Sequence, residues 1–381
     1  MRRAPMVVVP AAAILALQLM TGCGSRGDKL QLRPVVPTQV RRIVQGAQSF
    51  DDIFERTREL QLSSDTAGLL GTCSQVLLSR GNLLAVDSRV SKRVAVFDAS
   101  SGRFLRSIGS VGRGPGQYSE PTWVAVDSSG RVLVLDGQSG RLYRYTIQGV
   151  ALGTIDLARK GLFATRVEVG PRNQYYLMLN HPSLSRGTHG RLVAVIDSSG
   201  NLARSLGPSA VKSSKFFYTG GGLSISGGGL VFVVQPFDLG LQVWSVSGEP
   251  VAVVRDHLED LPSPLRPELL HSAQSTPALL KLLQKHLTAN GLFVLRSGLV
   301  VLTSSSGSRY CMSFFDAGSL EVLNGGICVT AENSGSLTSP ILGVWGDSLF
   351  LVEEPAGPRP RSRAPVRNIK VVIFRLRGST G

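Results

Sequence analysis

Residues 112–136 are the stretch that most constrains what this 381-residue chain can fold into. They read GRGPGQYSEPTWVAVDSSGRVLVLD: apolar and polar residues alternate, the pattern breaks at Ser-Gly, and it resumes until Asp136. This pattern predicts two antiparallel strands joined by a tight turn, with a sharp corner at the preceding Gly-Pro-Gly. A weaker copy occupies residues 81–109, and further copies follow. A sheet unit that recurs in this way predicts a radial array of small β-sheets.

Six copies of the unit can be aligned. Each pairs a second strand with a third: residues 83–87 with 93–97, 131–136 with 141–145, 174–179 with 191–196, 230–235 with 241–246, 299–303 with 309–315, and 348–353 with 368–376. An inner strand precedes each pair, at residues 73–78, 122–127, 163–169, 222–226, 291–296 and 340–345.

An outer strand follows every pair except the last. Residues 54–63 precede the first inner strand and belong to no unit, so we expect them to supply the missing outer strand. Joining both chain ends in one sheet removes an exposed edge. The predicted fold is therefore an all-β, six-bladed β-propeller closed by an N-terminal strand.

One passage, residues 256–290, has helical spacing. Ser275-Thr276-Pro277 combines an N-cap with a proline in the first turn, and an apolar stripe follows. We expect a short helical insertion between blades 4 and 5, which lies either across the pore mouth as a lid or on the rim for stability. The stripe comprises Leu279, Leu280, Leu282, Leu283 and Leu287.

The N-terminus predicts export. Two arginines precede an apolar run at residues 6–20, which is too short to span a bilayer comfortably and is typical of a secretory signal. The sequence Met-Thr-Gly before Cys23 resembles the bacterial lipobox. That resemblance implies a signal peptide at residues 1–22, acylation of Cys23, a flexible lipidated tether at residues 23–50, and the propeller at residues 51–381.

By the same resemblance, Gly24 implies the outer membrane, facing the periplasm or the exterior. The alternative is an ordinary signal peptide whose cysteine is incidental.

The repeats also resemble a known family. Residues 112–136, with 141–145 behind them, resemble an NHL repeat, and the chain is similar to bacterial six-bladed β-propeller lipoproteins with such repeats. Blades 4 to 6 depart from the pattern because they lack the Gly-Pro-Gly corner and the closing aspartate. The strand-closing residues Asp87, Asp127 and Asp136 are expected to bind turn amides.

Three cysteines remain beside Cys23. Cys73 lies in an apolar strand and is expected in the core. Cys311 and Cys328 lie across an expected hairpin, and an exported protein can oxidise them. Simple register places Cys311 opposite a residue near 325, so the sequence predicts either a disulfide that requires a bulge or two buried thiols.

The net charge of +15 favours anionic partners in general. The arginines are spread over many loops without a recognisable nucleic-acid module, so nucleic acid is not an expected partner. The alternative is an arginine-rich composition that serves no ligand.

The long insertions all fall on one face of the predicted disc, at residues 181–190, 207–221, 256–290 and 355–367. This face is the expected ligand site for an envelope protein, a peptide or an anionic glycan. The candidate ligand-binding residues are Arg93, Arg113, His181, Arg186, His189, Arg361 and Arg363.

No catalytic residues, metal site or cofactor are predicted, because none of the five histidines has metal-ligand spacing. The sequence favours a lipid-anchored binding or scaffold module of the cell envelope. The alternative is a secreted metal-dependent lyase or hydrolase with its site at the pore mouth.

Overall fold

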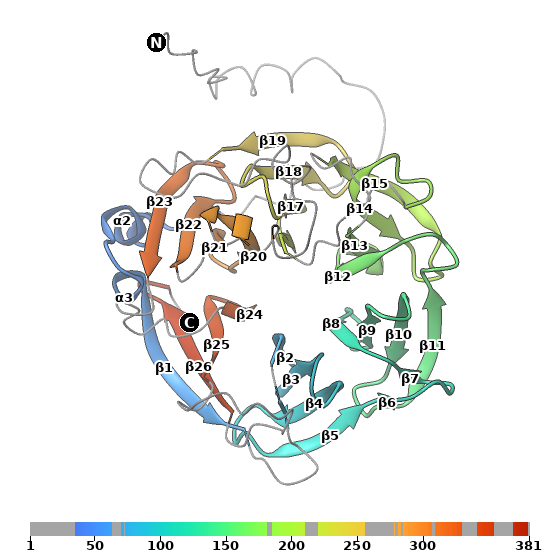
Figure 1. Cartoon of the computed structure of the whole chain (residues 1–381). Coiled ribbons are helices and arrows are strands. Elements are labelled where there is room, and N and C mark those ends of the chain that lie inside the picture. Colours follow the sequence, from blue (N-terminus) through green and yellow to red (C-terminus); the bar gives the residue numbers. More distant parts are fainter. Residues whose placement is uncertain are drawn as a thin grey trace. The chain divides into compact units, whose positions relative to one another are not determined.

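Six four-stranded antiparallel sheets follow one another around a ring, which confirms the predicted six-bladed β-propeller (Figure 1). This computed structural model describes residues 35–62, 70–71, 73–180, 185–209, 220–255, 278, 281–282, 285–306, 309–329, 341–353 and 369–379.

Each blade runs from an inner to an outer strand. Blade 1 comprises β2 (Gln75–Ser79), β3 (Asn82–Asp87), β4 (Arg93–Asp98) and β5 (Phe104–Ile108); blade 2 comprises β8 (Pro121–Val126), β9 (Val132–Asp136), β10 (Arg141–Tyr145) and β11 (Ala151–Asp156); blade 3 comprises β12 (Ala164–Val169), β13 (Tyr175–Leu179), β14 (Arg191–Ile196) and β15 (Leu202–Pro208).

Blade 4 comprises β16 (Gly222–Ile225), β17 (Leu230–Val234), β18 (Leu241–Ser245) and β19 (Pro250–Val254); blade 5 comprises β20 (Thr288–Val294), β21 (Leu299–Ser306), β22 (Arg309–Asp316) and β23 (Val322–Val329); blade 6 comprises β24 (Ile341–Trp345), β25 (Ser348–Glu353), β26 (Lys370–Leu376) and β1 (Phe54–Gln61). A short parallel pair, β6 (Ser110–Val111) and β7 (Gln117–Tyr118), connects blades 1 and 2, and a 3-10 turn, η1 (Pro171–Asn173), joins β12 to β13.

The beginning of the chain closes the ring. Strand β1 pairs antiparallel with β26, from Phe54 opposite Leu376 to Gln61 opposite Lys370. The first and last strands thus share blade 6 (Figure 1). This confirms the predicted closure.

The packing explains why the central strands are apolar on both faces. In β3, Leu83 and Ala85 pack toward blade 6, whereas Leu84 and Val86 pack toward blade 2. The six hydrophobic clusters each lie between two neighbouring blades. The described residues therefore form no single central core, and the stability of the ring depends on neighbour-to-neighbour contacts.

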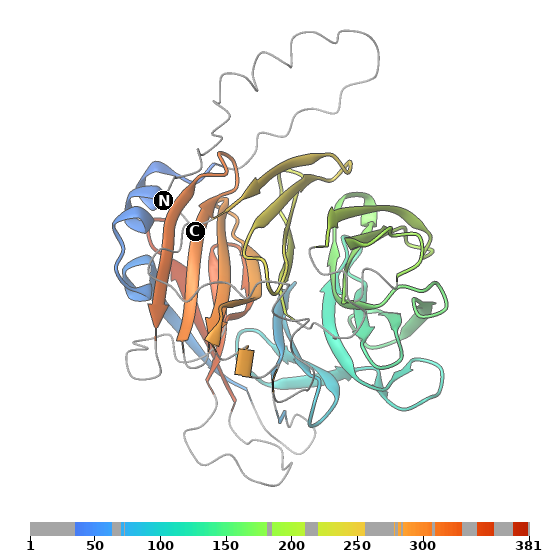
Figure 2. The ribbon, with the colours of Figure 1, turned by 45° about the horizontal axis from the view of Figure 1, so that its top comes forward.

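The flexible tether predicted at residues 23–50 is wrong for its described part from Val36 onward. Two helices form there, α2 (Thr38–Gly46) and α3 (Phe50–Ile53), and they lie beside blades 5 and 6 (Figures 1 and 2). Val36, Val40 and Val44, four residues apart, are buried in the cluster between those blades, which is the spacing of one helix face.

Polar contacts fix this N-terminal clasp, the segment of residues 36–53. Arg41 pairs with the buried Asp316 and with Glu321. The Asn324 amide donates to the carbonyl oxygens of Val44 (3.0 Å) and Ala47 (3.1 Å). Each of these partners lies in blade 5, at or near the edge strand β23.

The strand-closing aspartates bind turn amides, as predicted. Asp136 is fully buried and accepts hydrogen bonds from the backbone of Ser119, Glu120, Gln138 and Ser139. Asp87 does the same for the backbone of residues 71 and 89–91, and Asp127 for residues 129 and 131.

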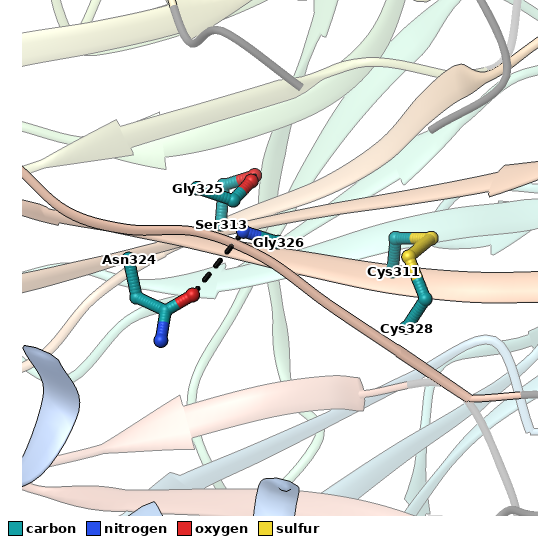
Figure 3. The surroundings of a disulfide bond; sticks show 6 residues. All are labelled: Cys311, Ser313, Asn324, Gly325, Gly326 and Cys328. Carbon is teal, nitrogen blue, oxygen red and sulfur yellow. Dashed lines mark hydrogen bonds between the residues drawn. A yellow bond between two sulfur atoms is a disulfide. The ribbon is translucent and has the colours of Figure 1, made fainter. Parts of the chain in front are cut away.

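Cys311 and Cys328 form a disulfide between β22 and β23 (Figure 3). They stand opposite one another because the register shifts twice, around Phe314, which is the irregularity that the sequence required. Nearby, Ser313 donates to the Gly325 carbonyl oxygen at 2.8 Å. Cys73, expected in a core strand, lies just before β2 and is only partly buried; its Sγ donates to the Gln75 carbonyl oxygen at 3.3 Å.

Candidate ligand-binding cavity in the central channel

The described members of the predicted binding face lie in three loops of blades 1 to 3. Arg93 begins β4, Arg113 lies between β6 and β7, and Arg186 and His189 lie between β13 and β14. Because strands alternate in direction, these loops share the face of the outer-to-inner crossovers. His181, Arg361, Arg363, Cys23 and most of residues 256–290 lie outside the described residues.

One of these residues has a visible structural role. The Arg186 backbone N–H donates to the Gly161 carbonyl oxygen. The aliphatic part of the Arg186 side chain covers Gly161, where an added Cβ would lie 2.7 Å from Arg186 Cγ. No described contact assigns a ligand to Arg186.

A cavity of about 290 Å³ occupies the central channel, lined by the inner strand of every blade. It extends to Ser79 and Arg80 at the end of β2 and to Asp127 after β8. These positions belong to the turns between first and second strands. The cavity therefore reaches the face opposite the predicted binding face, and it was not among the sites expected from the sequence.

Most of the lining is aliphatic, with a few convergent polar groups. Gln75 is committed to structure: its amide donates to the Val124 carbonyl oxygen (2.9 Å) and accepts from the Val124 N–H (2.7 Å), linking blades 1 and 2. The apolar lining comprises Val76, Leu77, Leu78, Val124, Ala125, Val126, Val169, Leu223, Leu292, Phe293, Leu342 and Val344.

Strand β12 brings two charges to the channel. Arg166 and Glu168 are two residues apart, so the period of the strand puts them on the same side. The Arg166 guanidinium lies over the Trp123 ring, 4.5 Å from its centroid, and donates to the Asn290 carbonyl oxygen at 2.8 Å. Arg166 thus connects the inner strands of blades 3 and 5, which are not neighbours in the ring.

The second charge, Glu168, lines the cavity beside Trp123. Burial raises the pKa of the Glu168 carboxyl from its ordinary 4.5 to about 7, and the nearby Arg166 charge and Trp123 side chain offset only part of that rise. Burial lowers the pKa of Arg166 to about 10, so the guanidinium remains charged at neutral pH.

Trp123 brings one polar atom, its ring Nε1, to the same place. Nε1 is buried, and its interaction with the Glu168 carboxyl lowers the pKa of that group against the larger effect of burial. A buried donor left without an acceptor is destabilising by about 1–3 kcal/mol, so Nε1 favours an acceptor beside it.

Among the described residues, no group of three or more His, Cys, Asp or Glu side chains is placed to hold a metal ion. No helix in this part of the chain is long and apolar enough to cross a membrane.

The sequence did contain a signal for this site. Strand β12 reads ATRVEV, in which two charged residues occupy alternate positions of a strand close to the channel axis. A charged pair at such positions is unusual in a strand packed between blades. The partner residues come from other blades, so no local motif unites them.

The fold and cavity define a six-bladed β-propeller with two charged side chains, Arg166 and Glu168, on the channel side of β12. The chain belongs to the family described as Domain of unknown function (DUF4934), which matches residues 42–249.

Two solved structures share the fold. A candidate exported protein from Bacteroides fragilis has 15% identity and a TM-score of 0.62, with 86% of this chain and 97% of that chain covered. A member of the DUF4221 family from Bacteroides vulgatus has 11% identity and a TM-score of 0.59, with 86% and 98% covered. At these identities the likeness shows the fold alone.

Proposed function

We propose that this protein is an exported, lipid-anchored binding module of the cell envelope that holds a small polar ligand in its central channel. The observation that carries the proposal is the placement of Glu168 in a cavity lined by all six blades, beside Arg166 and Trp123. An apolar pocket with a few convergent polar groups and a perturbed pKa is the usual form of a small-molecule site.

The anchor part of the proposal rests on the lipobox-like residues before Cys23 and on the NHL-type resemblance of residues 112–145. Two or three acyl chains on Cys23 would give a stable anchor. Replacing the cysteine, Cys23→Ser, is expected to move the protein from the membrane fraction to the soluble fraction, whereas Cys73→Ser leaves it membrane-bound. A Cys23→Ser protein that stays with the membrane contradicts the anchor.

The channel site can be tested by filling it. Ser224 lines the cavity from β16, and Ser224→Phe adds an aromatic ring there. Wild-type protein dialysed against a small-molecule envelope extract is expected to retain a compound detectable by mass spectrometry, and Ser224→Phe to retain less than a tenth of it. The matched control is Ser247→Phe at an exposed turn. Equal retention by the filled variant contradicts the channel site.

The opposite face, which carries residues 256–290 and the arginine-rich loops, is proposed to dock an envelope protein, a peptide or an anionic glycan. Deletion of residues 256–290 is expected to remove that partner from a pull-down, and an unchanged partner set refutes this assignment. If the deletion variant still retains the small ligand, the channel site and the partner-docking face act independently.

A further inference from the structure

The charges around the cavity do not balance. Arg166 is 8% exposed and, among the described residues, makes one hydrogen bond, to a neutral carbonyl oxygen. No described ion pair joins it to Glu168. A guanidinium removed from water without a formed ion pair attracts a negative charge strongly.

The rim adds a second positive charge. Arg80 lines the cavity and donates to the Ser128 carbonyl oxygen at 3.1 Å. Asp127 also lines the rim, but Arg131 binds its carboxylate at 2.6 Å and offsets its charge. The lining residues of β16, β20 and β24 carry no titratable group. The charged groups that line the cavity are therefore Arg80, Asp127 and Glu168, and Arg166 lies next to them, on the same side of β12 as Glu168 and over the Trp123 ring.

Burial places the pKa of Glu168 near neutral pH, at about 7, whereas the pKa of Arg166 is about 10 and that of Asp127 is lowered. With Glu168 ionised, the Arg166 charge is partly offset; with Glu168 protonated, Arg166 stands alone as a cation. An anion entering the channel would raise the pKa of Glu168 further, because like charges disfavour each other. Protonation of Glu168 also supplies an O–H donor for an oxygen of the ligand.

We propose that the ligand of the channel is a small organic carboxylate that pairs with Arg166 and binds together with one proton, which Glu168 takes up. This inference rests on the proposed function. The cavity has room for about ten water volumes of ~30 Å³ each, which suits a ligand of the size of a simple sugar acid or smaller.

Proton uptake gives the proposal a distinct signature. Above the pKa of Glu168, each binding event must first protonate the carboxylate, so affinity falls about tenfold per pH unit. In Glu168→Gln the side chain is permanently neutral, and this dependence is lost. The variant is therefore expected to match wild type at pH 5.5 and to bind about tenfold more tightly at pH 8. A purely structural role of Glu168 would not produce a gain that appears only at high pH.

The experiment is a calorimetric titration of the full chain with matched pairs of probes: acetate and acetamide, benzoate and benzamide, D-glucuronate and D-glucose. At least one carboxylate is expected to bind, its neutral counterpart at least tenfold more weakly, with a heat that changes with the ionisation enthalpy of the buffer at pH 8. Arg166→Gln is expected to lose binding at least tenfold, and the control Arg103→Gln, at an exposed turn between β4 and β5, to retain it. If Arg166→Gln does not fold, the pH profile of Glu168→Gln decides.

Three results would overturn the proposal. If a neutral probe binds as tightly as its carboxylate and Arg166→Gln does not weaken this binding, the ligand is not selected as a carboxylate, although the channel remains a binding site. If carboxylates bind with an affinity that does not change above pH 7, Glu168 does not take up a proton on binding. No binding of any probe at millimolar concentration, together with equal retention of extract compounds by Ser224→Phe, removes the channel function itself.

Discussion

Glu168 is also a titrating group of the folded protein without any ligand. Its carboxyl has a pKa of about 7 in the folded state against an ordinary 4.5, so between these pH values the folded state holds more of the proton than the unfolded chain. The free energy of unfolding therefore falls as pH rises through this window. The full difference corresponds to about 3 kcal/mol, which the partial exposure of Glu168 reduces to about 2 kcal/mol.

Glu168→Gln is expected to remove this component. In urea denaturation, the wild type should lose about 2 kcal/mol relative to the variant between pH 5 and pH 7.5. The exposed Glu249→Gln serves as the control and should follow the wild type. Parallel stability curves for wild type and Glu168→Gln would show that the carboxyl titrates at its ordinary pH.

Asp136 also carries a buried carboxylate, but unlike Glu168 it is surrounded by hydrogen-bond donors. Its oxygens accept four backbone N–H groups and the Ser139 hydroxyl, so the charge is fully hydrogen-bonded at a turn. Asp136→Ala leaves those donors buried without an acceptor and is expected to lower the free energy of unfolding by about 3 kcal/mol.

The control for Asp136 is Asp98→Ala, which removes a carboxylate that binds Ser100 and Ser101 at an exposed turn. Its loss should stay near 1 kcal/mol, because water replaces the missing acceptor. Equal losses at the two positions would mean that burial of Asp136 adds nothing. Asp136 was predictable because its donors lie within twenty residues, whereas the partners of Glu168 come from other blades.

At the scale of elements, the strands were predictable to within a few residues because alternation, turn residues and repeats agree. The N-terminal clasp was not. Prolines and arginines with no sustained period indicated a tether, yet three valines at four-residue spacing find an apolar surface between blades 5 and 6. That surface is made by residues about 250 or more positions later in the chain, so the short segment alone did not reveal the contact.

Phe50 tests the clasp. It is 2% exposed, and its ring lies 5.0 Å from the rings of Phe54 and Phe374. Phe50→Ala leaves a cavity and is expected to lower stability by about 3–4 kcal/mol. Val35→Ala, at a residue 60% exposed just before the clasp, should change stability by less than 0.5 kcal/mol. Thermal denaturation of both variants measures these changes in stability. If Phe50→Ala does not lower stability, the prediction of a tether is favoured over a packed clasp.

At the scale of the molecule, blade number and closure were predictable because each blade repeats one pattern and one strand was missing from the sixth. The channel was not, because it exists only when six inner strands meet. Its width depends on how closely the inner strands approach each other, and glycines set the closest approaches. An added Cβ at Gly222 would lie 2.3 Å from Leu292 Cβ, between blades 4 and 5.

Gly343 sets the tightest of these approaches, between blade 6 and blade 1. A Cβ there would lie 1.9 Å from the backbone carbonyl oxygen of Val76 in β2, an atom that cannot rotate away as a side chain can. Gly343→Ala must therefore push β24 from β2 and open the ring beside the cavity. We expect a loss of about 3 kcal/mol in denaturant unfolding. Gly227→Ala, where an added Cβ has no neighbour within 4 Å, should be neutral. A Gly343→Ala protein as stable as Gly227→Ala would mean that blades 6 and 1 do not meet as closely as this ring requires.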